Sequence, residues 1–298
     1  MEYRYLTCDV FTRERFGGNP LAVLPDAQGL DGQQMQRIAR EFNYSETAFV
    51  LPPEQGHTRR VRIFTPTREV PFAGHPNVGT AFCLASSGAF GDIDKGTTVC
   101  FEELAGLVHI TIDRDADGGL RCELAAPASL ELGQQVPAEL IAKAVSLDVN
   151  AVKTTAHQPC VASVGLPFVF AELADRSALE KAQYDIAGLK GIADLGIEPD
   201  LYVYCAGDEG FDIRARMFAP FDGVPEDPAT GSANCAMAGL LCSLLPDADA
   251  DPSWRVAQGV EMGRPSELNV RASRRDGKVT GTWVGGYSVP VASGTIRV

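Results

Sequence analysis

The sequence lacks any apolar stretch long enough to cross a membrane, and it does not open on a basic segment followed by an apolar one. A membrane-spanning helix needs about 20 apolar residues, and a secretory leader needs both of those regions. Residues 1–5 instead lead directly into a strand-like pattern. We therefore expect a cytoplasmic protein.

Basic residues are scarce. The chain has 26 Lys and Arg against 39 Asp and Glu, which gives a formal net charge of -13, and the densest basic group is the short segment 271–275. Such an average field repels phosphate backbones and anionic membranes, so we expect neither as a partner. A small anion can still bind where local helix dipoles outweigh the mean charge.

Metal-binding and disulfide patterns are also missing. The eight cysteines contain no C-x-x-C pair and mostly have apolar neighbours, while the four histidines lie far apart. We interpret the cysteines as small core residues rather than as disulfide, metal or catalytic groups. We expect no metal and no cofactor.

The most informative stretch is residues 61–84. It begins as an alternating strand, breaks at Pro66 and Pro71, and continues after Gly74 with apolar residues at helical spacing. The pattern predicts a strand, a tight turn and a helix whose first N–H groups have no partners. With Gly74 allowing close approach and His75 beside them, these groups are suited to holding a small carboxylate.

The same design returns later in the chain. Residues 216–220 repeat the character of 62–66, and 227–234 again end at a Gly-led helix start; a fainter match joins 18–24 to 165–171. With 298 residues and 45% hydrophobic content, the chain can form two similar domains, each with a core. We expect them at 1–118 and 119–298, with the last strand, about 287–298, able to cross back, and a site between them would receive two helix N-termini.

Each motif has a simpler interpretation. A Gly-led turn is often only a tight connection, but two copies, one beside His75 and one beside Asp227, favour a binding role. Glu46 stands at the edge of an apolar run, where partial burial would raise its pKa towards a value useful for carrying protons. Residue type alone favours an ordinary exposed glutamate at a strand end.

Other segments have clear secondary-structure patterns. A helix capped by Asp31 is expected to end near Asn43, and Glu46 should lead into a strand. A helix at 233–245 is apolar nearly all round, which is typical of a buried helix. Further strands are expected at 3–10, 21–24, 99–101, 107–112, 120–124, 201–205 and 214–218, with three more after 266, and further helices at 137–147, 177–183 and 189–195.

Three motifs together, at 43–47, 71–76 and 227–233, resemble the PhzF family of phenazine-biosynthesis isomerases and their relatives. The resemblance extends from Gly18-Asn19-Pro20 to 258–266, nearly the whole chain. It implies an α/β (α+β) fold with two pseudo-symmetric domains of the diaminopimelate epimerase-like type, each a twisted sheet wrapped around a central helix, with the active site in the cleft. It also implies a homodimer.

The resemblance assigns roles residue by residue. Glu46 becomes the general acid/base, with His75 and Asp227 as polar partners. The substrate-binding residues it implies are Gly74, Gly231, Ser232 and Asn19. The implied activity is a cofactor-independent isomerase that moves a proton between carbons of a small unsaturated carboxylate, as the phenazine enzyme of this family does on a dihydro-hydroxyanthranilate.

Thiol-dependent epimerases and proline racemases that share the fold carry a cysteine at each helix start. This chain has Ala73 and Thr230 there, each followed by a glycine, so a two-thiol mechanism is disfavoured.

Two alternatives stay open. An epimerase or racemase of a small amino or hydroxy acid that uses Glu46 and Asp227 as its bases remains a rival. A ligand-binding homologue that has lost its chemistry is the other.

Overall fold

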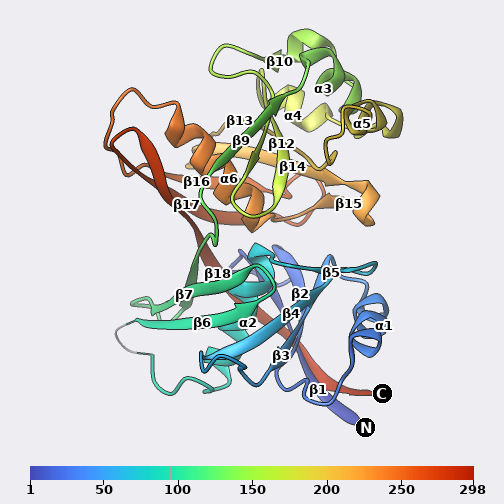
Figure 1. Ribbon diagram of the computed structural model, residues 1–298, viewed down its shortest axis with the longest axis vertical. Helices are drawn as coiled ribbons and strands as arrows, with labels where there is room; N and C mark the ends of the chain where they lie inside the picture. The colour runs from blue at the N-terminus through green and yellow to red at the C-terminus, as the bar shows by residue number, and fades with distance from the viewer. Residues whose placement is uncertain (94–95) are drawn as a thin grey trace. The chain divides into compact units, whose positions relative to one another are not determined.

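The computed structural model describes residues 1–93 and 96–298 (Figure 1). The chain divides into two compact units. The first unit comprises Met1–Pro127 with Val284–Val298, and the second comprises Ala128–Trp283. The division lies after Pro127 rather than after residue 118, because β8 (Leu120–Ala125) pairs with β7 (Gly106–Arg114) and so stays with the first unit.

The first unit is a sheet that closes on itself. β1 (Glu2–Val10) pairs with β2 (Asn19–Leu24), β2 runs parallel to β3 (Glu46–Leu51), and β3 pairs with β4 (Arg59–Phe64). β4 runs parallel to β6 (Thr97–Glu103), which continues through β7 to β8. The final segment of β18 (Lys278–Arg297) pairs with both β1 and β8, so it completes the ring.

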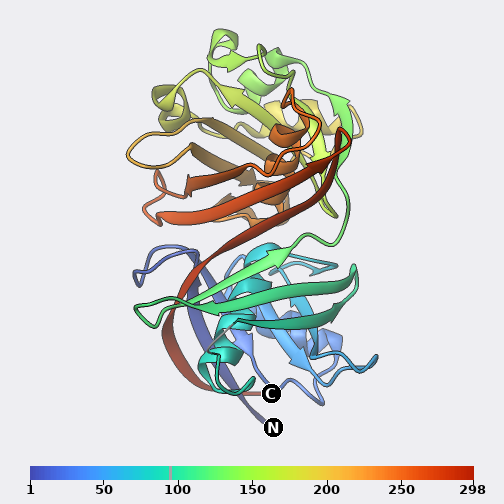
Figure 2. The same cartoon turned by 90° about the vertical axis from the view of Figure 1, so that its left-hand side faces the viewer.

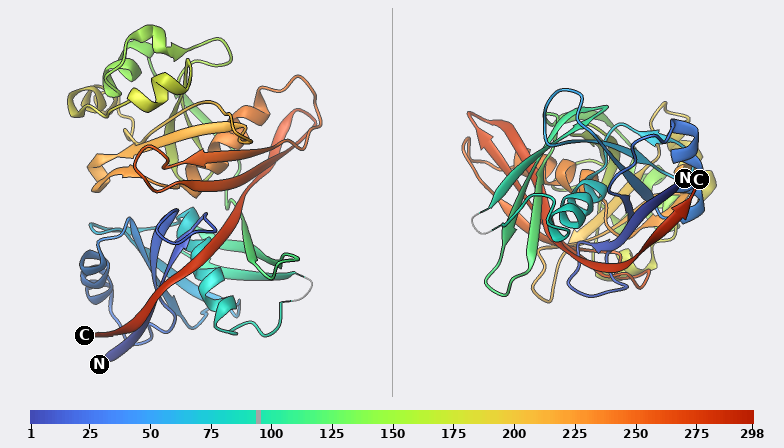
Figure 3. Two further views of the ribbon diagram at one scale, coloured as in Figure 1. Left: turned by 180° about the vertical axis from the view of Figure 1, so that it is seen from behind. Right: turned by 90° about the horizontal axis from the view of Figure 1, so that it is seen from below.

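Helix α2 (Gly74–Ser86) runs inside this ring (Figure 3), and every residue from Gly74 to Ala85 is buried. Small residues allow the strands to pack closely around the helix. A Cβ added at Gly79 would lie 2.5 Å from a Leu21 methyl and 2.6 Å from a Val10 methyl, so the strands approach the helix more closely than any larger residue allows. The expected central helix is confirmed.

Helix α1 (Gly32–Phe42) covers one side of the first unit and matches its sequence pattern closely. Asp31 accepts from the Gln34 amide at 2.8 Å, while the Gln34 side chain accepts from the Asp31 amide at 2.9 Å. Asn43 ends the helix in the left-handed conformation, with φ 53°. The apolar face of α1 packs in a cluster with strand residues, which comprises Tyr3, Leu24, Ala27, Leu30, Met35, Ile38, Ala39, Phe49 and Phe64.

The second unit repeats the strand order of the first. β11 (Cys160–Ser163) pairs with β12 (Pro167–Leu173), β12 runs parallel to β13 (Leu201–Ala206), and β13 pairs with β14 (Ile213–Ala219). β14 runs parallel to β16 (Ser253–Gln258), and β16 pairs with β17 (Ser266–Arg275). The predicted duplication is therefore visible in the pairing of the strands.

Helix α6 (Gly231–Ser243) is the counterpart of α2, and both are 13 residues long. All residues from Gly231 to Leu240 are buried, as its apolar sequence predicted. In both units a short strand precedes the helix: β5 (Glu69–Val70) before α2, and β15 (Val224–Asp227) before α6. The short elements that complete the second unit are β9 (Glu131–Gln135), β10 (Val152–Lys153), α3 (Ala138–Ala144), η1 (Val149–Ala151), α4 (Arg176–Lys181), α5 (Ile186–Ala193) and η2 (Pro220–Asp222).

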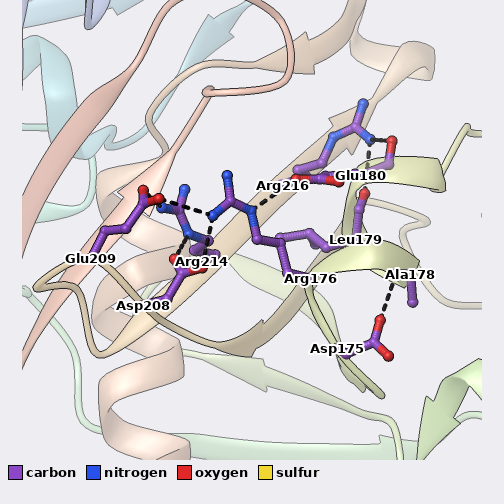
Figure 4. A network of polar contacts seen from close by, with 9 residues as sticks. All are labelled: Asp175, Arg176, Ala178, Leu179, Glu180, Asp208, Glu209, Arg214 and Arg216. Carbon is purple, nitrogen blue, oxygen red and sulfur yellow. Dashed lines mark hydrogen bonds and ion pairs between the residues drawn. The ribbon is translucent and has the colours of Figure 1, made fainter.

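A charged network ties α4 to strand β14 (Figure 4). Arg176 donates to Asp208 at 2.7 Å, and Arg214 donates to both Asp208 and Glu209. The two guanidinium groups hold the pKa of Asp208 below its usual range. The Arg214 side chain is buried while the carboxylates stay partly exposed, so this network fixes the turn between β13 and β14.

The end of the chain differs from its sequence pattern. Two strands, β17 and the 20-residue β18, follow residue 266 where three were expected (Figure 2). Gly285 allows the long strand to continue, since a Cβ there would lie 2.9 Å from the Glu123 side chain. The two termini meet in the first unit, where the Val298 amide donates to the Met1 carbonyl at 2.9 Å. No helix in the described ranges 1–93 and 96–298 is long and apolar enough to cross a membrane.

Candidate active site

Glu46 is the first residue of β3 and pairs with Leu21 of the parallel strand β2. Its side chain is 18% exposed, which places it between the buried strand and solvent. Oε2 lies 3.7 Å from Nδ1 of His75 at the start of α2. The structure therefore brings the two first-unit residues singled out in the sequence into one group.

His75 is 2% exposed, and this burial lowers its pKa to about 3. The imidazole is neutral at physiological pH because charging it would require desolvating a cation. The Asn19 amide nitrogen lies 3.2 Å from Nδ1, and the Asn19 oxygen accepts from the Ser45 hydroxyl at 2.9 Å. This chain of contacts assigns the acceptor role to Nδ1 and the proton to Nε2.

Nε2 of His75 makes no hydrogen bond to any residue in the described parts of the chain, although it is buried. A neutral imidazole with its N–H in this position is a hydrogen-bond donor without a charge. Such a donor can bind a hydroxyl or carbonyl oxygen beside the Glu46 carboxyl.

The first turn of α2 adds further donors. Its N-cap is Ala73, whose side chain cannot cap the helix, and none of the described side chains supplies a capping hydrogen bond. No acidic residue lies in that first turn. The opening N–H groups at Gly74 and His75 consequently offer partial positive charge to an anion.

The second unit holds the group around Asp227, the last residue of β15. Asp227 is 7% exposed, and one carboxyl oxygen accepts from the Thr230 hydroxyl at 2.6 Å. Gln258 donates to the Asp227 carbonyl at 2.8 Å and to the Thr230 hydroxyl at 3.0 Å. The Asp227 carboxyl is thus oriented by the Thr230 hydroxyl, which is itself held by Gln258.

Helix α6 starts directly after this group. Its N-cap Thr230 directs its hydroxyl to Asp227 and so does not cap the helix with its own side chain, while the Thr230 amide donates to the Gln258 side chain. Gly231 is the first residue of α6, and Ser232, which follows, is 4% exposed. The start of α6 therefore repeats the uncapped turn of α2, with a serine in place of His75.

Each of the two turns is preceded by an arginine–glutamate ion pair. Arg62 binds Glu69 through two hydrogen bonds of 2.7 Å, and Arg216 binds Glu226 through bonds of 2.8 and 2.9 Å. The first pair links β4 to β5, which leads into α2, and the second pair links β14 to β15, which leads into α6. Because two parallel hydrogen bonds fix the geometry of a guanidinium and a carboxylate, each pair positions the turn that follows.

Within the first unit, the structure brings together Glu46, His75, Gly74 and Asn19, and within the second it brings together Asp227, Gly231 and Ser232. Sequence patterns gave no role to Ser45 or Gln258, because their partners come from distant strands. They also gave no role to Asp200, which is 4% exposed. The repeat matches Leu21 with Phe168, so the strand register makes Asp200 the counterpart of Glu46.

No group of three or more His, Cys, Asp or Glu that could hold a metal occurs in ranges 1–93 and 96–298. All eight cysteines lie in those ranges, and none forms a disulfide. Cys235 in α6 is fully buried. The first unit thus offers a half-buried carboxylate and a neutral imidazole N–H beside the start of α2, and the second unit offers an oriented aspartate beside the start of α6.

Comparison with known proteins matches these features to one family. The family model described as "Phenazine biosynthesis-like protein" covers residues 8–294. An uncharacterized isomerase of Mesorhizobium japonicum is 39% identical, over 99% of this chain and 98% of its own. The trans-2,3-dihydro-3-hydroxyanthranilate isomerase of Pseudomonas aeruginosa is 37% identical, over 98% of both chains.

A solved structure supports the fold. The PhzF-family phenazine biosynthesis protein of Bacillus anthracis superposes with a TM-score of 0.90 over all of both chains, at 24% sequence identity. The ring of strands around a buried helix, the repeated helix starts and the full-length sequence matches all agree, and the chain belongs to the phenazine biosynthesis-like family of PhzF proteins.

Proposed function

We propose that this protein is an isomerase that moves a proton between carbons of a small unsaturated carboxylate, of the trans-2,3-dihydro-3-hydroxyanthranilate class, without a metal or organic cofactor. The relatives named as isomerases support the reaction class. The observation that carries the proposal is the half-buried Glu46 carboxyl beside the neutral His75 at an uncapped helix start.

In this proposal Glu46 protonates one carbon and recovers a proton at another. A single carboxyl can perform both steps because a proton shift leaves the enzyme unchanged after each turnover. His75 donates its Nε2–H to a substrate oxygen, which disperses the negative charge that develops when a proton leaves carbon.

The remaining site residues bind the substrate. The helix N–H groups at Gly74 and Gly231 and the Ser232 hydroxyl hold its carboxylate. Asp227 holds an amino or hydroxyl group, because its carboxyl is already oriented by Thr230. Asn19 fixes the tautomer of His75 through their 3.2 Å contact.

The direct test is turnover of trans-2,3-dihydro-3-hydroxyanthranilate in deuterium oxide, followed by NMR. We expect the ring double bonds to move and one deuterium to enter the carbon that receives the proton. Failure to turn over this compound and a panel of related cyclic unsaturated carboxylates would overturn the proposal. Conversion without exchange at carbon would contradict the acid/base step.

An epimerase or racemase of a small amino or hydroxy acid is the alternative reaction. The half-buried Glu46 and the buried Asp227 favour it, since inversion of a carbon needs two acid/base groups. Loss of optical rotation, with exchange at a single carbon and no double-bond movement, would identify it. A homologue that only binds ligand would bind the carboxylate without exchange.

We further propose that the protein acts in the cytoplasm as a homodimer and that its ligand is a small-molecule carboxylate. The dimer follows from the family resemblance and can be measured by analytical ultracentrifugation. A sedimenting species of 31.8 kDa would contradict it.

A further inference from the structure

Glu103 is the last residue of β6, and its side chain is unusual for a carboxylate. Both carboxyl oxygens are buried, and neither makes a hydrogen bond of ordinary geometry with the described residues. The adjacent loop is tied to the segment before α2, since the Ala105 amide donates to the Pro71 carbonyl at 3.0 Å. A buried carboxyl therefore stands close to the turn that opens α2.

The internal repeat identifies the counterpart of Glu103. Parallel pairing places Glu102 opposite Arg60 in the first unit and Ala257 opposite Arg214 in the second. The two units match Arg62 with Arg216, and hence Arg60 with Arg214. One residue further along each strand, Glu103 corresponds to Gln258.

Gln258 connects its strand to the start of α6. Its side-chain oxygen accepts from the Thr230 amide at 3.2 Å and from the Asn234 side chain at 2.9 Å. Its nitrogen donates to the Asp227 carbonyl and to the Thr230 hydroxyl. The amide uses both a donor and an acceptor, so an ionised carboxylate could not replace it.

The asparagine in each helix is also repeated. Asn234 donates to the carbonyl of its N-cap Thr230 at 2.9 Å, and Asn77 donates to the carbonyl of its N-cap Ala73 at 2.9 Å. Asn234 contacts Gln258, and the Asn77 amide is close enough to Glu103 to lower the pKa of its carboxyl, although burial raises that pKa by more. The same pair of positions therefore meets at the start of both helices.

We propose that Glu103 is a positioning residue which, as a neutral carboxylic acid, takes the place that the Gln258 amide holds in the other unit and supports the turn carrying Gly74 and His75. A protonated carboxyl combines a donor with an acceptor, as the Gln side chain does, although it has one hydrogen to donate where the amide has two. The catalytic part of this inference rests on the proposed function, because the supported turn is the one that would bind and protonate substrate.

The surroundings keep Glu103 neutral. Burial is the largest cause that holds the pKa of its carboxyl well above the usual range, and no described charged group adds to the shift. On α2 the one titratable group before Cys83 is His75, which is neutral. On β5, Glu69 is bound to Arg62. On β6 itself, Glu102 accepts from the amides of 54, 55 and 57.

The first test compares Glu103→Gln with wild type in denaturant titrations from pH 4 to 8. The unfolded chain ionises this carboxyl above about 4.5, whereas the folded chain keeps it neutral, so Glu103 costs the wild type stability as pH rises. The amide does not titrate. We expect the denaturation midpoint of Glu103→Gln to rise relative to wild type as pH increases.

Glu102→Gln is the matched control on the neighbouring residue. Burial raises the pKa of Glu102, but three backbone N–H groups outweigh this and hold it below its usual range. Its stabilising effect is present above the unfolded pKa and is lost as pH falls, so Glu102→Gln should destabilise most at neutral pH. If Glu103→Gln behaves like Glu102→Gln, Glu103 is ionised and the proposal is overturned.

The second test concerns catalysis. Glu103→Gln should keep kcat/KM within about threefold of wild type, while Glu103→Leu, which offers no polar group to Asn77, should lower it by up to about 10²-fold through misplacement of the turn. Equal activity of both variants would overturn the positioning role. The stability series needs no substrate, so an error in the proposed reaction would leave its result intact and the two failures can be distinguished.

Discussion

His75 and Glu46 show how burial sets the roles of two titratable side chains. The imidazole is almost fully buried and neutral, so it offers an N–H donor rather than a cation. The carboxyl lies 3.7 Å away and keeps some exposure. Proton transfer requires a group that can exchange its proton, and of these two only the carboxyl has access for that purpose.

The burial of His75 predicts a measurable pH dependence of stability. The unfolded chain binds a proton on this histidine below about 6.5, whereas the folded chain does so only near pH 3. The contribution of His75 to the free energy of unfolding is therefore fully present above the unfolded pKa. It falls by up to about 1.4 kcal/mol for each pH unit between about 6.5 and about 3. Chemical denaturation of His75→Gln should show a shallower fall over this range.

His109→Gln is the matched control, because His109 is exposed on β7. Its profile should follow that of the wild type. If His75→Gln and wild type lose stability in parallel between pH 6.5 and 3, the histidine is charged in the folded state and its assigned donor role is wrong.

Sequence motifs and the family resemblance pointed to the candidate site residues but not to their contacts. Glu46, His75 and Asp227 stand in recognisable local motifs, whereas the contact between Asn19 and His75 joins residues 56 positions apart. Glu103 and Gln258 have no local signal, because an isolated Glu or Gln at a strand end is ordinary. Only the pairing of β4 with β6, and of β14 with β16, reveals that they are counterparts.

At the scale of elements, the helices divide into capped and uncapped. Helix α1 has a reciprocal cap, while the N-cap residues of α2 and α6, Ala73 and Thr230, make no capping hydrogen bond with their own side chains. An uncapped buried helix start leaves N–H groups without partners, which costs stability. We interpret this cost as the condition for binding a carboxylate at those groups.

Supplying the missing cap should therefore stabilise the protein and impair its function. Ala73→Ser places a hydroxyl at the N-cap of α2, where capping contributes about 0.5–2 kcal/mol. The same hydroxyl competes with the substrate carboxylate, so KM should rise severalfold. Thermal unfolding and steady-state kinetics measure the two effects.

Asp31→Ala provides the opposite comparison on α1. It removes an existing cap and should cost about 0.5–2 kcal/mol while leaving KM unchanged, since α1 carries none of the proposed site residues. A variant Ala73→Ser that gains stability with an unaltered KM would exclude the α2 start as a carboxylate site.

The sequence predicted the first and last residues of some helices and strands better than those of others. The capping box of α1 has a strong sequence signal, and its bounds matched. Helix α3 is shorter than the expected 137–147 because its apolar pattern continues into a turn at Val145 and Ser146, where Ser146 takes a positive φ of 56°. Three strands were expected after 266, but glycines such as Gly285 let β18 continue as one long strand packed closely against its neighbours.

At the scale of the whole molecule, the chain is a tandem repeat whose last strand returns to its first unit. The repeat could be predicted from the matching motifs, because each copy keeps its own strand, turn and helix. A return of the last strand, at about 287–298, was also expected, but its partners were not, since β18 pairs with both β1 and β8 across almost the entire sequence.

Removal of the returning segment tests this architecture. A chain that ends at Trp283 leaves β1 and β8 without a shared neighbour, and unpaired strand edges promote aggregation. We expect loss of soluble protein and of protease resistance in residues 1–127. A chain that ends at Thr295 keeps the β1 pairs from Arg4 onward and should remain folded. Normal solubility of the shorter chain would contradict the closed ring.

The central claim is that the Glu46 carboxyl carries the transferred proton, and Glu46→Gln tests it most directly. Glutamine keeps the shape but removes the exchangeable acid, so kcat for the isomerisation should fall by about 10²- to 10⁴-fold, with loss of deuterium incorporation. Glu131→Gln, at the exposed first position of β9, should match wild type. If Glu46→Gln turns over substrate within about tenfold of wild type and still incorporates deuterium, another group moves the proton and the account is contradicted.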